Sequence, residues 1–141
     1  MKFYVDACVL IYLMDINSPF QQRVQHALTE SFRNENTLVS SDLVRLESRI
    51  KPLKDGQHEI LAEFDTFFHR NVHIWCNFSR PVFDLATQLR AEHGLKTPDA
   101  LHLAAAITHG CNEFWTNDNR LQKAASAHLQ VINVFAAQEL S

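Results

Sequence analysis

The sequence predicts an α/β protein with a mostly parallel sheet covered by helices on both faces. Short apolar runs recur along the 141 residues, and segments with helical spacing of apolar residues lie between them. Strands that alternate with helices are joined by right-handed crossovers, which pack the helices against the sheet. Hydrophobic residues make up 46% of the chain, enough for a substantial core. We therefore expect one domain over residues 1–141.

Five short apolar segments are the candidate strands. Each is bounded by polar or turn-forming residues and is short for a helix. Continuous hydrophobicity is typical of strands that are buried on both faces of a parallel sheet. The five segments are residues 2–5, 37–39, 72–78, 114–116 and 131–134.

Helices are predicted between the strands by apolar residues three and four positions apart. Residues 40–42 supply N-cap chemistry for a helix that residues 52–56, from proline to glycine, should end. Gly94 ends one helix, and Pro98 begins the next at the favoured first position. The predicted helices begin and end near residues 9–14, 20–34, 42–51, 57–70, 79–92 and 97–109.

Composition excludes several classes of protein. The net charge is −3 and Lys and Arg form no block, which argues against a passive nucleic-acid-binding module.

Cys8, Cys76 and Cys111 are widely separated, so they predict neither a disulfide framework nor a zinc motif, and they fit a reducing cytoplasm. The N-terminus is interrupted too early for a signal peptide, and no apolar run approaches the roughly 20 residues of a membrane span. With three glycines the chain has no phosphate-binding loop for ATP or NAD.

Four acidic residues, Asp6, Glu47, Asp99 and Asp118, stand where a solvated charge is not the first expectation. Asp6 follows the first strand and Asp118 follows the fourth, so both belong at the carboxyl edge of the sheet, where ligands bind in such folds. Asp99 opens a helix that is apolar on most sides and therefore central. If the fold gathers them, the carboxylates suit a hard cation such as Mg²⁺ or Mn²⁺.

Glu47 is the most informative of the four because of its helical spacing. Leu43, Leu46 and Ile50 lie at positions that share a helix face with it, and we expect this face to point inward. A carboxylate directed at a core is costly unless it is paired or bound to metal. His102 lies on the same side of its helix as Asp99, which brings it within reach of the site, but we expect it to have a packing role.

Each acid also has a local explanation that leaves function aside. Asp6 fits a turn or a helix N-cap, and Asp99 in the first turn of a helix is favoured by the macrodipole. Glu47 fits an ion pair with Arg45 or Arg49, or a place at the edge of the apolar stripe. Asp118 follows polar residues that commonly form turns. From the residues alone these alternatives stay open.

Four segments resemble the motifs of PIN-domain proteins, in the same order. VDACVLIYL at residues 5–13 is similar to their opening, and SDLVRLE at 41–47 to their second acidic motif. TPDALHLAAA at 97–106 is similar to the third motif in the form typical of VapC toxins, and WTND at 115–118 to the last. The resemblance spans the whole chain. One departure is that Ala7 and Cys8 stand where many members have Thr or Ser and then Asn.

The resemblance implies a three-layer α/β/α sandwich with a five-stranded parallel sheet. It implies a Mg²⁺- or Mn²⁺-dependent ribonuclease, the toxin of a type II toxin–antitoxin pair that inhibits translation and growth. It also implies a homodimer and a small antitoxin partner. By motif match, Asp6, Glu47, Asp99 and Asp118 are the metal-binding and catalytic acids, and Thr116 supports them. The alternatives are a degenerate PIN domain that binds a partner without cleaving, and a structure-specific DNA nuclease.

Overall fold

The fold is built on one sheet of five parallel strands. The computed structural model describes residues 1–125 and 127–135. The strand order is β3-β2-β1-β4-β5, and every pairing is parallel, which confirms the predicted fold class. The strands are β1 (Lys2–Val5), β2 (Thr37–Ser41), β3 (Ile74–Cys76), β4 (Glu113–Thr116) and β5 (Gln130–Asn133).

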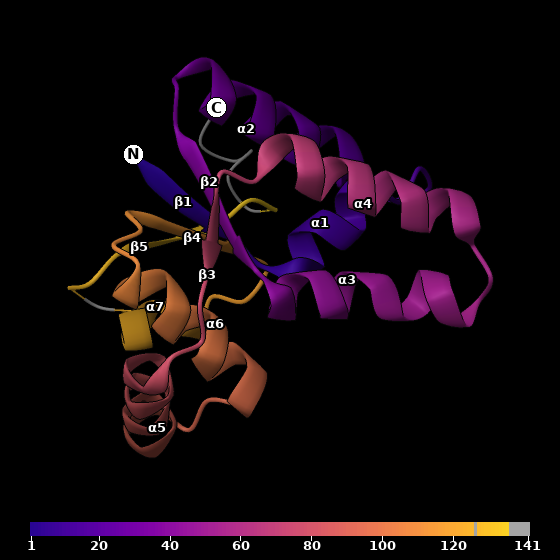
Figure 1. Cartoon of the computed structure of the whole chain (residues 1–141). Helices are drawn as coiled ribbons and strands as arrows, with labels where there is room; N and C mark the ends of the chain where they lie inside the picture. Colours follow the sequence, from indigo (N-terminus) through magenta and orange to yellow (C-terminus); the bar gives the residue numbers. More distant parts are fainter. Residues whose placement is uncertain (126, 136–141) are drawn as a thin grey trace.

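Helices cover both faces of the sheet and complete the three layers (Figure 1). One face carries α1 (Ala7–Leu13), α2 (Gln21–Arg33), α3 (Asp42–Lys54) and α4 (His58–Asn71). The other face carries α5 (Arg80–His93), α6 (Thr97–Thr108) and the short α7 (Leu121–Ala125). The strand order decides which face each helix covers. The chain moves along the sheet in one direction from β1 to β3 and in the opposite direction from β3 to β5, and right-handed crossovers in opposite directions place their helices on opposite faces.

No helix among the described residues combines the length and the apolar character that crossing a membrane requires.

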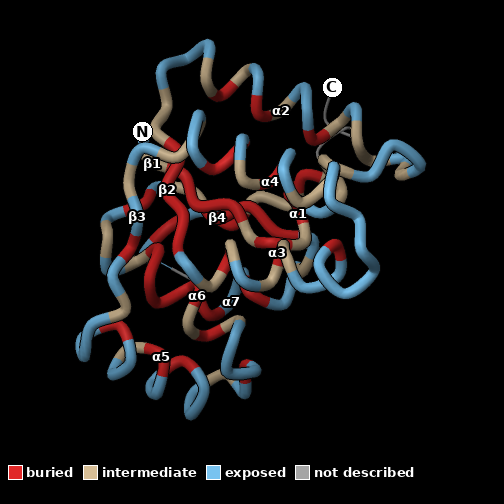
Figure 2. The backbone as a smooth tube through the Cα atoms, turned by 45° about the vertical axis from the view of Figure 1, so that its right-hand side comes forward, coloured by how far each residue is buried: buried red, intermediate tan, exposed pale blue. Residues whose placement is uncertain are grey.

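The core lies along the central strands and the layer of α6. The tube in Figure 2 is red, hence buried, along most of β1, β2 and β4. Tyr4 of β1 is fully buried, and its ring stacks on Phe114 of β4 with centroids 5.4 Å apart. In α6, residues 103–106 are fully buried, as expected for a helix that is apolar nearly all round. This packing fixes the backbone from which the acidic residues project.

Some predicted boundaries are wrong. The helix expected to end at Pro52 continues to Lys54, with Pro52 inside it. Proline removes one backbone donor, but the ring of Pro52 is buried beside α4, and its burial offsets the lost hydrogen bond. The strand expected at residues 72–78 shortens to three residues, because Val72 still caps α4. The short helix α7 was not predicted.

Gly94 provides a test of helix termination. It caps α5 in the left-handed conformation, with φ of 67°, and its backbone N–H donates to the carbonyl of Arg90 at 2.9 Å. A side chain added there would meet nothing within 4 Å, so only the backbone conformation opposes it. We expect Gly94→Ala to lower the free energy of unfolding by roughly 1–2 kcal/mol. Urea denaturation measures this, and an unchanged value would show that the cap relaxes out of the left-handed region.

Candidate metal centre at the carboxyl edge of the sheet

The predicted acids converge where two adjacent strands send the chain to opposite faces. From β1 the chain enters α1 on one face, whereas from its neighbour β4 it enters α7 on the other. Such a switch point opens a crevice at the carboxyl edge of a parallel sheet. Asp6 directly follows β1, and its N–H donates to the carbonyl of Trp115 in β4 at 2.9 Å.

Asp6 is held by the fold on both carboxylate oxygens. It is the N-cap of α1, where Oδ1 accepts the N–H of Ala7 at 2.8 Å, so the capping alternative and the site coexist. Oδ2 accepts the hydroxyl of Thr116 at 3.2 Å. Burial raises the pKa of Asp6, and the charge of Glu47 raises it further, while His102 and the hydrogen bonds act in the opposite direction.

Glu47 reaches the site from α3, although the expected inward face of this helix is wrong. Leu46 and Ile50 are each 55% exposed, and the buried residues are Val44 and Ser48. Glu47 therefore lies at the border of the buried face, one turn after Val44. A helix with apolar residues on two sides offers two possible inward faces, and spacing alone selected the wrong one.

The neighbouring arginines do not neutralise Glu47. Arg49 and Arg45 lie 3.0 and 3.8 Å from Asp65 of α4 and pair with it instead. Glu47 pairs with His102, whose Nε2 lies 2.5 Å from Oε1 of Glu47. The arginine-pairing alternative therefore gives way to a contact inside the site.

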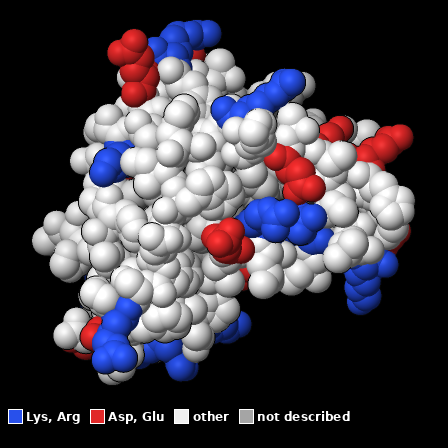
Figure 3. Space-filling view, in the orientation of Figure 1, with Lys and Arg blue, Asp and Glu red and all other residues white. Residues whose placement is uncertain are grey.

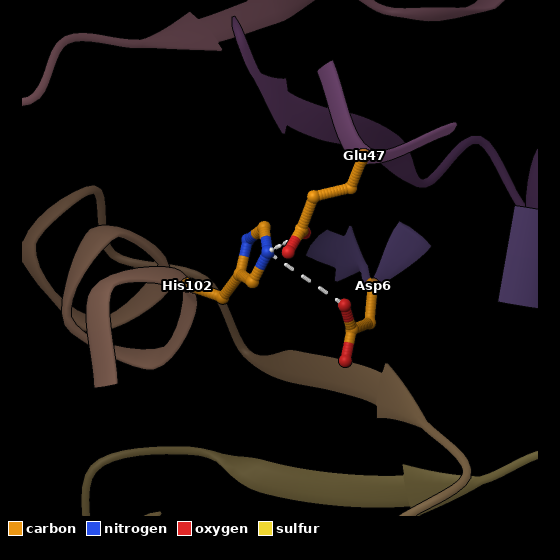
Figure 4. A group of neighbouring side chains, drawn as sticks. All are labelled: Asp6, Glu47 and His102. Carbon is orange, nitrogen blue, oxygen red and sulfur yellow. Dashed lines mark hydrogen bonds and ion pairs between the residues drawn. The ribbon is translucent and has the colours of Figure 1, made fainter. Parts of the chain in front are cut away.

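His102 stands at the centre of the site instead of merely packing in the core (Figure 4). Its side chain is 1% exposed, and Nε2 also lies 3.8 Å from Oδ1 of Asp6. One ligand atom from each of Asp6, Glu47 and His102 lies within 4.8 Å of the others. The signal available in the sequence was the three-residue step from Asp99, which places both side chains on one side of α6.

Asp99 and Asp118 are coupled to this group electrostatically. Asp99 lies in the first turn of α6, and its pKa is raised by burial first and by the charge of Asp118 second, with Glu47 adding to the rise. Asp118 forms a bidentate ion pair with Arg120, whose Nε and Nη2 donate to the Asp118 carboxylate at 2.7–3.1 Å. These hydrogen bonds lower the pKa of Asp118. The ligand-atom group of Asp6, Glu47 and His102 includes neither of these two acids. The charge of Asp99 interacts with Glu47 and His102, whereas Asp118 is linked to the group through the charge of Asp99 and through Thr116.

Thr116 connects the residues that follow β1 with those that follow β4, and Cys8 lies against its hydroxyl. The Thr116 hydroxyl donates to Asp6 and accepts the N–H of Asp118 at 3.3 Å. The thiol of Cys8 is 4.0 Å from the same hydroxyl. Burial, and next the charge of Asp6, raise the pKa of Cys8 to about 12, so the thiol is neutral. Cys8 therefore adds no charge to the site.

The donor set fits a hard divalent cation. The carboxylates come from the end of β1, from α3, from the start of α6 and from the loop after β4, and their oxygens are the ligands that Mg²⁺ and Mn²⁺ prefer. The raised pKa values of Asp6 and Asp99 show that negative charge is crowded and desolvated here. A divalent cation would relieve both effects.

One family model matches most of the chain. It describes the PIN domain and covers residues 3–127. No curated protein matches the sequence.

Solved structures of toxin–antitoxin proteins share the fold. VapBC2 from Rickettsia felis, bound to a DNA fragment from its promoter, aligns with a TM-score of 0.76 at 18% identity, covering 94% of this chain and 98% of the other. A toxin–antitoxin complex from Klebsiella pneumoniae aligns with 0.68 at 22% identity, covering 93% and 96%. VapC20 from Mycobacterium tuberculosis, a toxin that cleaves the sarcin–ricin loop, aligns with 0.70 at 12% identity, covering 91% and 98%.

Proposed function

This chain belongs to the PIN-domain family, and on that premise we propose that it is a Mg²⁺- or Mn²⁺-dependent ribonuclease, the toxin of a type II toxin–antitoxin module. The observation that carries the proposal is the gathering of acids at the switch point of the sheet. Asp6 and Glu47 meet around His102, and Asp99 and Asp118 are coupled to them. Carboxylates placed together in this way suit metal-assisted hydrolysis of a phosphodiester.

The four acids have distinct places in the proposed reaction. We assign Asp6 and Asp99 as direct ligands, with Asp118 binding directly or through water. Glu47 either completes the ligand set or orients the attacking water. A bound divalent ion would supply Lewis-acid activation of the phosphodiester and of water. Thr116 holds the Asp6 carboxylate in place through its hydroxyl.

RNA is the proposed substrate, and charge alone does not reveal it. On the face drawn in Figure 3, basic and acidic side chains are interspersed on a largely uncharged surface. The net charge of −3 also gives no strong general attraction for a polyanion. Recognition would then depend on a few contacts close to the metal centre.

Oligonucleotides of one sequence, made as RNA and as DNA, test the activity and its class. We expect Mg²⁺- or Mn²⁺-dependent cleavage of the RNA that stops in EDTA, because the acids have no cation to bind. Cleavage of the DNA alone would show that the protein is a DNA nuclease and contradict the ribonuclease assignment. Cleavage that continues undiminished in EDTA would remove the metal from the mechanism. A chain that binds no Mn²⁺ in calorimetry and cleaves neither would be the degenerate interaction protein.

The proposed partner is a small antitoxin whose extended segment blocks the acidic site. The aligned structure from Klebsiella pneumoniae is described as a toxin–antitoxin complex, which supports the idea by analogy of fold. We expect expression of this chain to arrest growth and co-expression of the adjacent reading frame to relieve the arrest. The three cysteines are free, and two of them are buried, so we place this activity in a reducing cytoplasm.

A homodimer is supported by an apolar row on α3. Leu46, Ile50 and Leu53 are exposed at 55–62% and recur at helical spacing, so they form a stripe on the surface. Sedimentation should give about twice the 16.2 kDa mass of one chain. A charge on this stripe, as in Ile50→Asp, should shift the chain to monomer if the stripe is the interface. An unshifted dimer would place the interface elsewhere.

A further inference from the structure

A chain of hydrogen bonds reaches Glu47 through the interior of the protein. Ser41 at the end of β2 accepts the N–H of Val44 at 3.3 Å, and its Oγ lies 2.8 Å from the hydroxyl of Tyr4. The Tyr4 hydroxyl lies 2.7 Å from Nδ1 of His102. Nε2 of His102 then lies 2.5 Å from Oε1 of Glu47. The chain thus connects β2, β1 and α6 with the acid on α3.

The direction of these hydrogen bonds follows from counting donors. Ser41 is fully buried and already accepts one N–H, so its own hydroxyl hydrogen is free to donate to Tyr4. The oxygen of Tyr4 accepts this hydrogen, so the Tyr4 hydroxyl donates its own hydrogen to its other partner, Nδ1 of His102. The ring proton of a neutral His102 is therefore on Nε2, where it donates to Glu47.

The opposite direction leaves groups unsatisfied. If Nδ1 carried the proton, Tyr4 would donate to Ser41, and the Ser41 hydroxyl would have no acceptor among the described residues for its own hydrogen. An unprotonated Nε2 would also set its lone pair against a carboxylate oxygen only 2.5 Å away. Only the first direction satisfies all four side chains of this network, so the network selects the tautomer.

We propose that His102 is a positioning residue whose Nε2–H, fixed by Tyr4 and Ser41, holds one oxygen of Glu47 and keeps His102 itself out of the metal's ligand set. This rests on the proposed metal site. The remaining oxygen of Glu47 and the lone pairs of Asp6 are then left for the cation. An imidazole ligand would favour softer metals, whereas an imidazole that donates leaves an all-oxygen set for Mg²⁺ or Mn²⁺. Hydrogen bonds of this kind orient metal-binding carboxylates in many sites.

The first experiment measures the ring directly in the metal-free protein. Two-dimensional ¹H–¹⁵N spectra of the imidazoles distinguish a nitrogen that carries hydrogen from one that does not. We expect His102 to show the Nε2–H tautomer at neutral pH and to keep it when Mg²⁺ is added. The Nδ1–H tautomer would overturn the proposal, and so would loss of the Nε2 proton on adding Mg²⁺, because it would show direct ligation.

The second experiment separates the donor from the bulk of the ring. The amide of Gln reaches close to the position of Nε2, whereas the shorter Asn does not. His102→Asn should weaken Mn²⁺ binding by about 10–100-fold in calorimetry, and His102→Gln should restore most of the affinity. The matched control is His109→Gln at the other end of α6, where Nδ1 of His109 lies 2.9 Å from the carbonyl oxygen of Ala105, and this variant should bind Mn²⁺ like the wild type. Equal losses in His102→Asn and His102→Gln would overturn the proposal.

Failure of this inference is distinguishable from failure of the proposed function. The spectra report the tautomer and calorimetry reports the affinity for metal, and neither measurement needs RNA. A chain that shows the Nε2–H tautomer and the Gln rescue but cleaves no RNA would contradict the ribonuclease alone. A wild-type chain that binds no Mn²⁺ would overturn both. Spectra of the wild type also avoid the case in which a variant of a buried residue fails to fold.

Discussion

Asp6→Asn should lower the rate of RNA cleavage by roughly 100-fold or more while leaving the fold intact. The reason is that Asn keeps the shape of the side chain but removes the charge that holds the cation. Its Oδ1 still accepts the N–H of Ala7, and Asn caps helices as well as Asp does. Asp99→Asn should have the same effect. Single-turnover cleavage at saturating Mn²⁺ gives the rates, and circular dichroism confirms the fold.

The matched control is Asp84→Asn. Asp84 is an exposed acid on α5, and it is outside the group of acids at the sheet edge. The variant removes the same charge from the chain, so a general effect of net charge on RNA binding would appear in it as well. We expect wild-type rates. If Asp6→Asn kept more than a tenth of the activity, Asp6 would not be a required ligand.

The position of the acids could be predicted from the sequence because the pattern of strands sets the edge of the sheet. Asp6 and Asp118 follow β1 and β4, and adjacent parallel strands end at the same edge. Asp99 was placed by its position at the start of an apolar helix. These inferences need only local spacing and topology, which survive errors of one or two residues at the ends of the elements.

The environment of Glu47 could not be predicted in the same way. Its partner His102 is 55 residues away in the sequence, and the pairing exists only once α3 and α6 pack on opposite faces of β1. Leu46 and Ile50 indicated the wrong inward face, because the apolar row they form is left on the surface. A row of this kind satisfies the helical pattern whether a core or a partner covers it. Packing, which spacing does not record, decides between the two.

The metal-free protein should become less stable as the pH rises through the range in which its acids ionise. Burial raises the pKa of Asp6 and of Asp99, so the folded state keeps protons that the unfolded chain releases near pH 4. The free energy of unfolding therefore falls from about pH 4 up to the folded pKa values and then levels off. Asp118 acts in the opposite sense, since Arg120 lowers its pKa and its contribution is lost as the pH falls.

The order of stability of Asp6→Asn and the wild type should therefore reverse when metal is added. In EDTA at neutral pH the variant should be the more stable protein, because it has no desolvated charge at position 6 and keeps its cap. At a Mg²⁺ concentration one hundred times the dissociation constant, the wild type should gain about 2.7 kcal/mol and the variant much less. Urea denaturation at both conditions measures the two differences.

Asp42→Asn is the control for this reversal. Asp42 is an exposed acid in the first turn of α3, where its charge favours the helix, so its loss should lower stability slightly with and without metal. The rank of that variant should not change. If Asp6→Asn were the less stable protein in EDTA, the Asp6 charge would be stabilised by the fold without a cation. The crowding of negative charge at this edge would then be a structural feature, and the case for a cation there would rest on affinity measurements alone.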